Sequence, residues 1–277
     1  MQGMVRIFLV AVITASLAGC DALMERTLKT GPNGPETPAS VGVPYQRVSI
    51  ASGPRRLDGY LVKAPERCTD PPAVVIYHGV GETISLWVRA QKLLYDHCVS
   101  SLVFDYTGNG NSSPHPTHDV LEDDAVAAFG FARQRFAGAR LFALGHSMGN
   151  GILLEALPRF ERAPKGIVLA NAFASLRAES ARSAWYYAVL SHVMPDWWNN
   201  VRAAQAIRVP VLVVAGDGDH VVPPDDSRQI FAAAPEPKHF VILHGYGHNA
   251  LYKKADEGWW KPVVDFFAPE AAKPVSE

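Results

Sequence analysis

The sequence predicts an α/β protein with a mostly parallel central sheet and helices on both of its faces. Short apolar runs alternate with helical segments between about residues 45 and 268, which is the pattern of repeated β-α units. Several runs, such as Ala73–His78, are apolar almost throughout, as expected for strands that are covered on both faces. Glycine-rich and polar stretches follow the runs, and in parallel sheets chemistry gathers at the carboxyl ends of strands.

A hairpin around Ser52-Gly53-Pro54 joins the first two strands, and the later strands are continuous apolar runs. The expected strands are 46–50, 57–63, 73–78, 102–106, 141–145, 166–171, 209–215 and 239–244. The expected helices are 85–96, 119–136 with its acidic first turn, 152–157 closed by a proline, 225–233 and 259–267.

Composition limits the classes of function. The chain has 277 residues, of which 48% are hydrophobic, so it can bury one sizeable core. Its formal net charge is −1, and no basic field indicates a nucleic-acid partner. Only 19% of the residues are charged, which favours a compact domain over a disordered chain. The sequence specifies no oligomeric state.

The N-terminus has the features of an export signal. Arg6 precedes the apolar run Ile7–Leu17, which is too short to span a bilayer and has the length of a signal-peptide core. The run ends in Leu17-Ala18-Gly19-Cys20, which resembles the lipobox of bacterial lipoproteins. The resemblance implies that residues 1–19 are removed and that Cys20 is lipidated, which would anchor the protein at the extracytoplasmic face of a bacterial envelope. The alternatives are an ordinary signal peptide with an incidental cysteine and an uncleaved anchor.

Residues 20–44 are rich in Pro, Gly, Thr and Ser, which predicts a flexible tether. Asp21 slightly favours the inner membrane, by resemblance to lipoproteins of enteric type. The folded domain is expected over residues 45–268, with a short helical lid at about residues 172–206. Residues 269–277 are expected to be a C-terminal tail.

The strand at 141–145 leads into Gly145-His146-Ser147-Met148-Gly149, and a helix follows. A strand, a sharp turn and a helix around Gly-x-Ser-x-Gly form a nucleophile elbow, in which the serine is exposed on a strained turn. Glycines flank the serine because a Cβ atom at either position would clash there. The alternative is a glycine-rich turn that contains a serine by chance.

A nucleophilic serine needs a base and a third group that orients the base. Two acids, Asp217 and Asp219, follow one late strand, and two histidines, His244 and His248, follow the next. The chain order of serine, acid and histidine is that of the α/β-hydrolases. The residues alone leave both acids open, whereas a loop position favours His248 because it can reach back over the sheet.

Several segments together resemble the serine-aminopeptidase-like branch of the α/β-hydrolases, near bacterial relatives of membrane-associated lipid hydrolases and protein depalmitoylases. They are His78-Gly79, Gly145 to Gly149, Arg208 to Leu212, Gly216 to Pro223 and Gly247-His248-Asn249. The resemblance implies that Ser147 is the nucleophile, that His248 is the base, and that Asp219 is the acid.

An oxyanion intermediate needs preorganised hydrogen-bond donors. The N–H of Met148, at the start of the helix, is one expected donor, and the N–H of Val80, in the loop after His78-Gly79, is the other. The alternative is that His78-Gly79 forms only a plain tight turn. The chain departs from its relatives at Val80-Gly81-Glu82-Thr83, where Asn, Ala or Gly are common. His146 is interpreted as the variable residue of the elbow, and the loop after Asp105 as structural support.

The segment between Asn171 and Val209 is longer than an ordinary crossover and is rich in aromatic residues. It forms either a helix pair packed on the sheet edge or a lid that lines an apolar acyl pocket. In the second case, Trp185, Trp197 and Trp198 line the substrate pocket.

Cys68 and Cys98 each lie just before a strand, and the hydrolase strand order makes these two strands neighbours. Since export leads to an oxidising compartment, we expect the two cysteines to form a disulfide at the amino end of the sheet. No metal-ligand motif and no dinucleotide fingerprint occurs, so no metal or cofactor is predicted.

The expected activity is therefore a membrane-anchored serine hydrolase acting on small-molecule or lipid esters or thioesters, without a cofactor. A peptidase or amidase with the same three residues is one alternative. A catalytically silent lipoprotein that binds a ligand is the other.

Overall fold

The computed structural model describes residues 25–183 and 196–268. The predicted signal peptide, Cys20, Asp21, Trp185 and the C-terminal tail lie outside the described residues. Within the described ranges, no helix is long and apolar enough to cross a membrane.

The expected strands and helices are present, close to their expected bounds. The strands are β1 (Gln46–Ser52), β2 (Arg55–Val62), β3 (Ala73–Tyr77), β4 (Ser100–Phe104), β5 (Leu141–His146), β6 (Ile167–Ala170), β7 (Val211–Gly216) and β8 (Lys238–Leu243). The α-helices are α2 (Val88–Asp96), α3 (His118–Arg135), α4 (Met148–Ala156), α5 (Leu176–Ser183), α7 (Asn200–Ala204), α8 (Pro224–Ala233), α9 (Ala250–Lys253) and α10 (Glu257–Phe267). Short 3₁₀ helices are η1 (Pro38–Val41), η2 (Ile84–Trp87) and η3 (Leu157–Arg159).

The strands form one eight-stranded sheet in the order β1-β2-β4-β3-β5-β6-β7-β8. Strand β2 runs antiparallel to β1 and β4, whereas all pairs from β4 to β8 are parallel. Because β3 to β8 are parallel, their carboxyl ends lie at the same end of the sheet. The loops that carry the candidate site residues follow these strands and therefore meet at this end, called the carboxyl edge below.

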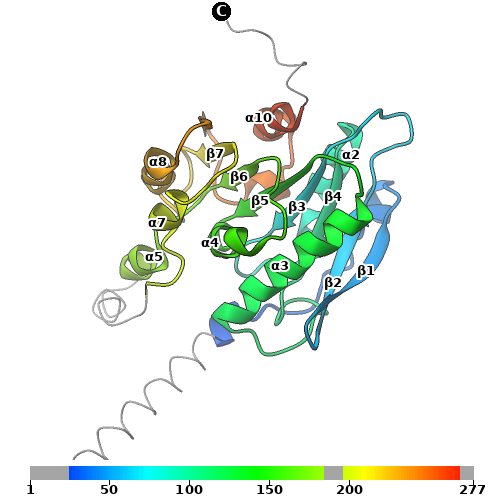
Figure 1. Cartoon of the computed structure of the whole chain (residues 1–277), viewed down its shortest axis with the longest axis horizontal. Helices are drawn as coiled ribbons and strands as arrows, with labels where there is room; N and C mark the ends of the chain where they lie inside the picture. Colours follow the sequence, from blue (N-terminus) through cyan, green and yellow to red (C-terminus); the bar gives the residue numbers. More distant parts are fainter. Residues whose placement is uncertain (1–24, 184–195, 269–277) are drawn as a thin grey trace, which may run out of the picture.

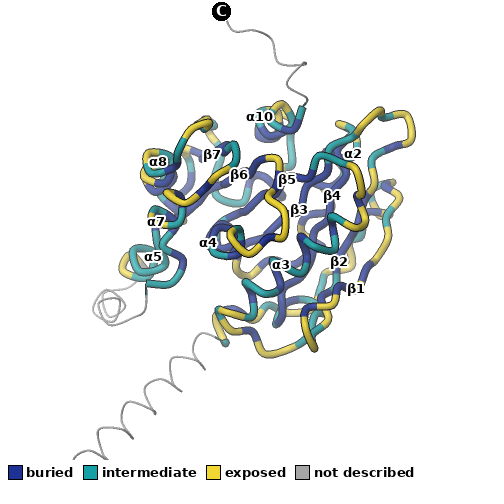
Figure 2. The backbone as a smooth tube through the Cα atoms, viewed as in Figure 1, coloured by how far each residue is buried: buried dark blue, intermediate teal, exposed yellow. Residues whose placement is uncertain are grey.

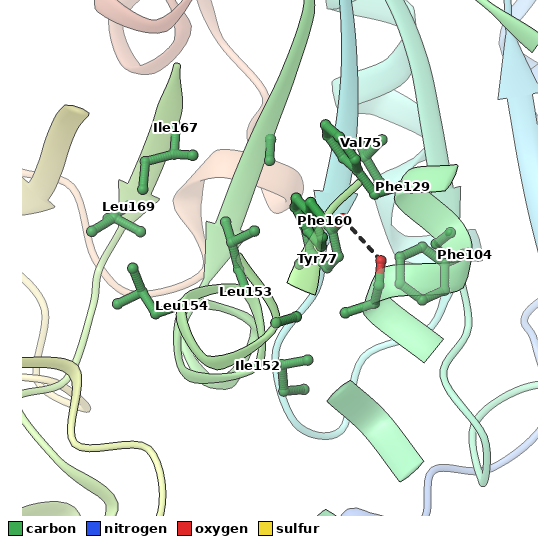
Figure 3. Packing of buried hydrophobic residues seen from close by; sticks show 14 of the residues in the cluster. Val75, Tyr77, Phe104, Phe129, Ile152, Leu153, Leu154, Phe160, Ile167 and Leu169 are labelled. Carbon is green, nitrogen blue, oxygen red and sulfur yellow. Dashed lines mark hydrogen bonds between the residues drawn. The ribbon is translucent and has the colours of Figure 1, made fainter. Parts of the chain in front are cut away.

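Each face of the sheet has its own hydrophobic core. Alternate side chains of the central strands point to the side of α3 and α4, which lie against each other (Figure 1), and the others to the side of α2, α9 and α10. Figure 2 shows the central strands as buried along their length, whereas exposed residues lie on outer helix faces, on loops and on the edge strand β1. On the α3 side, the Tyr77 hydroxyl donates a hydrogen bond to the carbonyl of Ala125 at 3.3 Å, the dashed line in Figure 3.

Residues 25–44 differ from the flexible tether that the composition predicts, because they pack on the domain. Leu28 and Val43 are buried in this segment. Asn33 donates to Oδ2 of Asp105 at 2.8 Å, and the backbone N–H of Gly34 donates to the hydroxyl of Ser85 at 2.9 Å. The folded unit therefore begins before Tyr45, the boundary drawn from the sequence.

The predicted disulfide between Cys68 and Cys98 is confirmed, with a Cα–Cα distance of 5.7 Å. Strands β3 and β4, which follow these cysteines, are parallel neighbours, and Ala73 pairs with Ser100 where they begin. The bridge therefore lies at the amino end of the sheet, opposite the carboxyl edge where the catalytic candidates gather.

Candidate active site

Ser147 lies between β5 and α4 in a strained backbone conformation, with φ 51° and ψ −119°. A non-glycine residue with positive φ is held there only by its surroundings. A Cβ on Gly149 would overlap the carbonyl of Tyr77, and one on Gly145 would lie 2.9 Å from the Cα of Asn150. The glycines thus let α4 start against β3 and β5, and the turn between them leaves Ser147 partly exposed.

Asn150, in the first turn of α4, fixes the turn from within. Its buried amide group donates to the carbonyls of Ser147 at 3.0 Å and Ala170 at 2.9 Å. The serine is thereby tied to the end of β6 as well as to its own helix.

The loop after β3 lies beside the serine, since a Cβ on Gly79 would come within 3.1 Å of the Ser147 Cβ. The next residue is Val80, the expected oxyanion donor. Met148, the other expected donor, is the first residue of α4, where backbone N–H groups have no intrahelical partner. Both predicted donors therefore lie on segments that flank Ser147.

The structure brings Asp219 and His248 together. Oδ2 of Asp219 lies 2.7 Å from Nδ1 of His248, and Oδ1 accepts the backbone N–H groups of Val221 and Val222 at 2.8 Å each. The Asp219 side chain is 1% exposed and that of His248 is 10% exposed. A carboxylate fixed by two N–H groups can accept Nδ1–H and hold the imidazole in the tautomer with Nε2 unprotonated.

The backbone of His248 is anchored as well as its side chain. Its carbonyl accepts a hydrogen bond from Nδ2 of Asn171 at 2.7 Å and another from Nε2 of His146 at 3.0 Å. Oδ1 of Asn171 in turn accepts the N–H of Gly216 at 3.1 Å. The His248 loop is thus connected to the ends of β5, β6 and β7.

The two alternative residues, Asp217 and His244, pair with each other. Nδ1 of His244 lies 2.7 Å from Oδ2 of Asp217, whose Oδ1 accepts the N–H of Gly245 at 2.7 Å. The His244 side chain is 86% exposed. The hydrogen bond with His244 is the main cause that lowers the pKa of Asp217. This pair links two surface turns.

His146 is more than a variable residue of the elbow, and Glu82 is more than a departure from the relatives. Both are buried, and Nδ1 of His146 lies 2.8 Å from Oε1 of Glu82. Sequence reasoning missed this pair; the signal was a charged residue in the glycine-rich loop that follows β3. Asn171, at the end of β6, was correctly placed on the carboxyl edge but given no role.

Asp105 supports the site as expected. It is fully buried, and its Oδ1 accepts the N–H of Ile84 at 2.9 Å, which holds the start of η2. Burial raises the pKa of Asp105, and the nearby His78 opposes that effect.

Of the residues expected to line the pocket, Trp197 and Trp198 are described. Both stack on His118 at the start of α3, with ring centroids 5.2 Å and 5.0 Å away. Trp198 is 3% exposed, and a Cβ on Gly151 would lie 2.7 Å from its Cβ. Trp198 is therefore a core residue under α4. A role for the two tryptophans in binding substrate stays a prediction.

Comparisons with known proteins identify the family. A profile of the family described as serine aminopeptidase, S33, matches residues 71–203 and 199–254. An uncharacterized protein of Mycobacterium tuberculosis is 31% identical over 180 residues, 64% of this chain and 63% of that protein. Lysophosphatidylserine lipase ABHD12 of Danio rerio is 26% identical over 211 residues, 66% of this chain and 55% of the relative. The matches thus span less than two thirds of these relatives.

Solved structures show the same fold. Esterase Pf2001 of Pyrococcus furiosus superposes with a TM-score of 0.69 at 17% identity, covering 86% of this chain and 97% of that one. Est1E of Butyrivibrio proteoclasticus, solved with ferulic acid, gives 0.66 at 21% identity, with coverages of 82% and 100%. Proline iminopeptidase of Mycobacterium smegmatis gives 0.63 at 15% identity, with coverages of 80% and 97%. The expected α/β-hydrolase fold is confirmed.

Proposed function

The chain belongs to the serine aminopeptidase S33 family of α/β-hydrolases, and on that premise we propose that it is a membrane-anchored serine hydrolase of carboxylic esters or thioesters. The observation that carries the proposal is the buried Asp219–His248 hydrogen bond at the carboxyl edge, where Ser147 is held on a strained turn. The relatives named as a lipase and an esterase favour ester bonds. The anchor is the proposed lipid on Cys20.

In the proposed reaction, the Ser147 hydroxyl attacks the substrate carbonyl carbon while Nε2 of His248 takes the hydroxyl proton. The resulting oxyanion accepts hydrogen bonds from the N–H groups of Val80 and Met148. The carbonyl C–O or C–S bond then breaks, the leaving group receives the proton from His248, and the acyl group stays on Ser147. Water then loses a proton to His248 and attacks the acyl carbon. The bond from that carbon to Ser147 Oγ breaks, Ser147 receives the proton from His248, and the acid is released. Asp219 stabilises the imidazolium in both halves.

A fluorophosphonate probe tests whether the protein is an enzyme or a silent binding protein. We expect the wild type to be labelled and Ser147→Ala to be unlabelled. Asn150→Ser, which alters the elbow but keeps the serine, is expected to be labelled more slowly. Equal labelling of the wild type and Ser147→Ala would contradict a Ser147 nucleophile.

Bond preference separates esterase from peptidase. The iminopeptidase fold neighbour makes a proline p-nitroanilide the appropriate amide substrate. We expect kcat/KM for p-nitrophenyl butyrate to exceed that for the anilide by at least tenfold. A preference for the anilide would replace the esterase proposal with a peptidase on the same residues.

An apolar substrate at a membrane surface is part of the proposal. Among the described residues, the exposed large hydrophobic side chains are Val80, Leu86 and Val221. Val80 follows the glycine beside Ser147, and the N–H of Val221 is bound to Asp219. Two of the three thus lie on loops that carry the catalytic groups, where an acyl chain would meet them.

The acyl-chain preference tests this part. Each buried CH₂ adds about 0.8 kcal/mol of binding, so kcat/KM is expected to rise from acetyl to octanoyl p-nitrophenyl esters. Val221→Ser and Trp197→Ala are expected to reduce the octanoyl value more than the acetyl value, which serves as the internal control. If acetyl is the best substrate and neither change alters the ratio, these side chains have no role in binding.

A further inference from the structure

Glu82 is a buried carboxylate that the proposed reaction does not use. It lies in the loop between β3 and η2, and the residue is 4% exposed. Its Oε2 accepts the backbone N–H of Gly79 at 3.0 Å and Nε1–H of Trp87 at 3.0 Å. A Cβ on Gly79 would touch both Glu82 Oε1, at 2.7 Å, and Ser147. Glu82 therefore holds the loop that precedes Val80 against the nucleophile.

The other oxygen of Glu82 faces His146, which is fully buried. Nδ1 of His146 lies 2.8 Å from Oε1, within ion-pair distance. Nε2 of the same ring lies 3.0 Å from the carbonyl oxygen of His248. A carboxylate and a carbonyl can only accept, so both ring nitrogens must carry protons when Glu82 is ionised.

We infer that Glu82 and His146 form a buried carboxylate–imidazolium pair that positions the oxyanion loop and the catalytic histidine relative to each other. One end of the pair binds the Gly79 N–H, and the other end binds the His248 carbonyl. This inference rests on the proposed function, since it assigns positioning residues to the same site. Neither residue touches the substrate in this scheme.

The surroundings of the pair are consistent with its charged form. Burial favours the neutral forms of both groups, but the charge of His146 and its contact with Glu82 lower the pKa of Glu82 overall. The Glu82 carboxylate likewise outweighs burial and raises the pKa of His146.

Other titratable groups also face the pair. Asp219 further favours the imidazolium, and His78 favours the carboxylate. The rings of His248 and Tyr252 lie 4.9 Å and 5.8 Å from that of His146. Burial raises the pKa of Tyr252 well above its ordinary value, so this ring brings no negative charge.

Glu82→Ala and His146→Ala remove the two ends of the connection. We expect each to lower kcat for p-nitrophenyl butyrate by about 10- to 100-fold, because small displacements of catalytic groups are costly, while KM changes less than about threefold. Glu82→Gln is the conservative variant. Its amide oxygen can accept the Gly79 and Trp87 N–H groups, and its NH₂ can donate to a neutral His146, so kcat should recover at least tenfold over Glu82→Ala.

The pH dependence of kcat is a further test, because it would not change if the pair had a purely structural role. Loss of the second His146 proton at alkaline pH leaves a lone pair facing an acceptor. We therefore expect wild-type kcat to fall on the alkaline side. Glu82→Gln, in which His146 is already neutral, should lack this fall.

The exposed His97–Glu257 pair, with Nε2 2.8 Å from Oε1, provides matched controls. His97→Ala and Glu257→Gln should match the wild type in both readouts. Folded Glu82→Ala and His146→Ala variants with wild-type kcat would overturn the inference. If these variants do not fold, a Glu82→Gln profile that superimposes on the wild type overturns it.

Fluorophosphonate labelling distinguishes a failure of the proposed function from a failure of the positioning role. If wild-type Ser147 is not labelled, the proposed function fails. If the wild type is labelled and folded His146→Ala is labelled at the same rate, the function stands and the positioning role is wrong.

Discussion

Two Asp–His pairs lie on the loops after β7 and β8, and in both the Oδ2–Nδ1 distance is 2.7 Å. Asp219 and His248 have side chains that are 1% and 10% exposed, whereas those of Asp217 and His244 are 43% and 86% exposed. Both carboxylates also accept backbone N–H groups. Distance alone therefore does not distinguish them.

Burial and anchoring do distinguish them. Electrostatic interactions are weakly screened in a buried site, whereas an exposed pair competes with water and salt. The carbonyl of His248 is bound by Asn171 and His146 from two other strand ends. The Asp219–His248 pair is thus fixed by its surroundings, while the Asp217–His244 pair joins two surface turns. What fixes a pair in place, rather than its distance, therefore marks the candidate catalytic pair.

The largest effect is expected from removing the histidines one at a time. His248→Ala should lower kcat by about 10⁴-fold or more, because no base remains for the serine proton. His244→Ala should change kcat less than about threefold. Steady-state kinetics with p-nitrophenyl butyrate measures both. Comparable losses of kcat in the two variants would contradict the assignment of His248, rather than His244, as the base.

Replacing the two acids should show the same contrast in kcat, with a smaller loss than for the histidines. Asp219→Asn should reduce kcat by roughly 10²- to 10⁴-fold, because the amide favours the wrong imidazole tautomer. Asp217→Asn, with the same chemical change, is the matched control and should stay within about threefold. An Asp217→Asn loss as large as that of Asp219→Asn would assign the acid differently.

Removing the disulfide at the opposite end of the sheet tests a region far from both pairs. It should lower the unfolding free energy without lowering kcat. The Cys68–Cys98 bridge closes a loop with a sequence separation of 30. Its replacement by two serines should cost about 3–4 kcal/mol of unfolding free energy in the chain-entropy model. Urea denaturation measures the loss, and kcat of the folded variant should be unchanged. A large fall in kcat would show that the amino end is coupled to the site.

The smallest effect concerns the pH dependence of stability at the buried Glu82–His146 pair. The pKa of Glu82 is lowered from 4.5, so its contribution is present above pH 4.5 and is lost as pH falls through the folded value. The pKa of His146 is raised from 6.5, so its contribution is present below pH 6.5 and is lost as pH rises through the folded value. The pair therefore stabilises most between pH 4.5 and 6.5.

Thermal melts of the wild type and Glu82→Gln at several pH values measure this effect. The Tm difference should be a few degrees at its maximum, since about 1 kcal/mol corresponds to roughly 2–4 °C in a domain of this size. It should shrink on both sides of the window. A difference that is constant from pH 4 to pH 9 would argue against a charged pair.

The sequence by itself determined the strands and helices and marked the candidate site residues. Apolar runs marked the strands, and the glycines around Ser147 marked the elbow, because these features depend on neighbours in the chain. The disulfide followed from two cysteines that precede strands which the resemblance made neighbours. The resemblance, rather than the residues alone, selected Asp219 over Asp217.

Tertiary structure alone decided the contacts between distant segments. Asn33 binds Asp105 across 72 residues, which fixes a proline- and glycine-rich segment that has the composition of a linker. His146 binds the His248 carbonyl across 102 residues, and the other nitrogen of its ring lies 2.8 Å from a carboxylate oxygen of Glu82. No local pattern encodes such pairs. A buried charge is stable only with its partner in place, and the partner is chosen by how the sheet brings strand ends together.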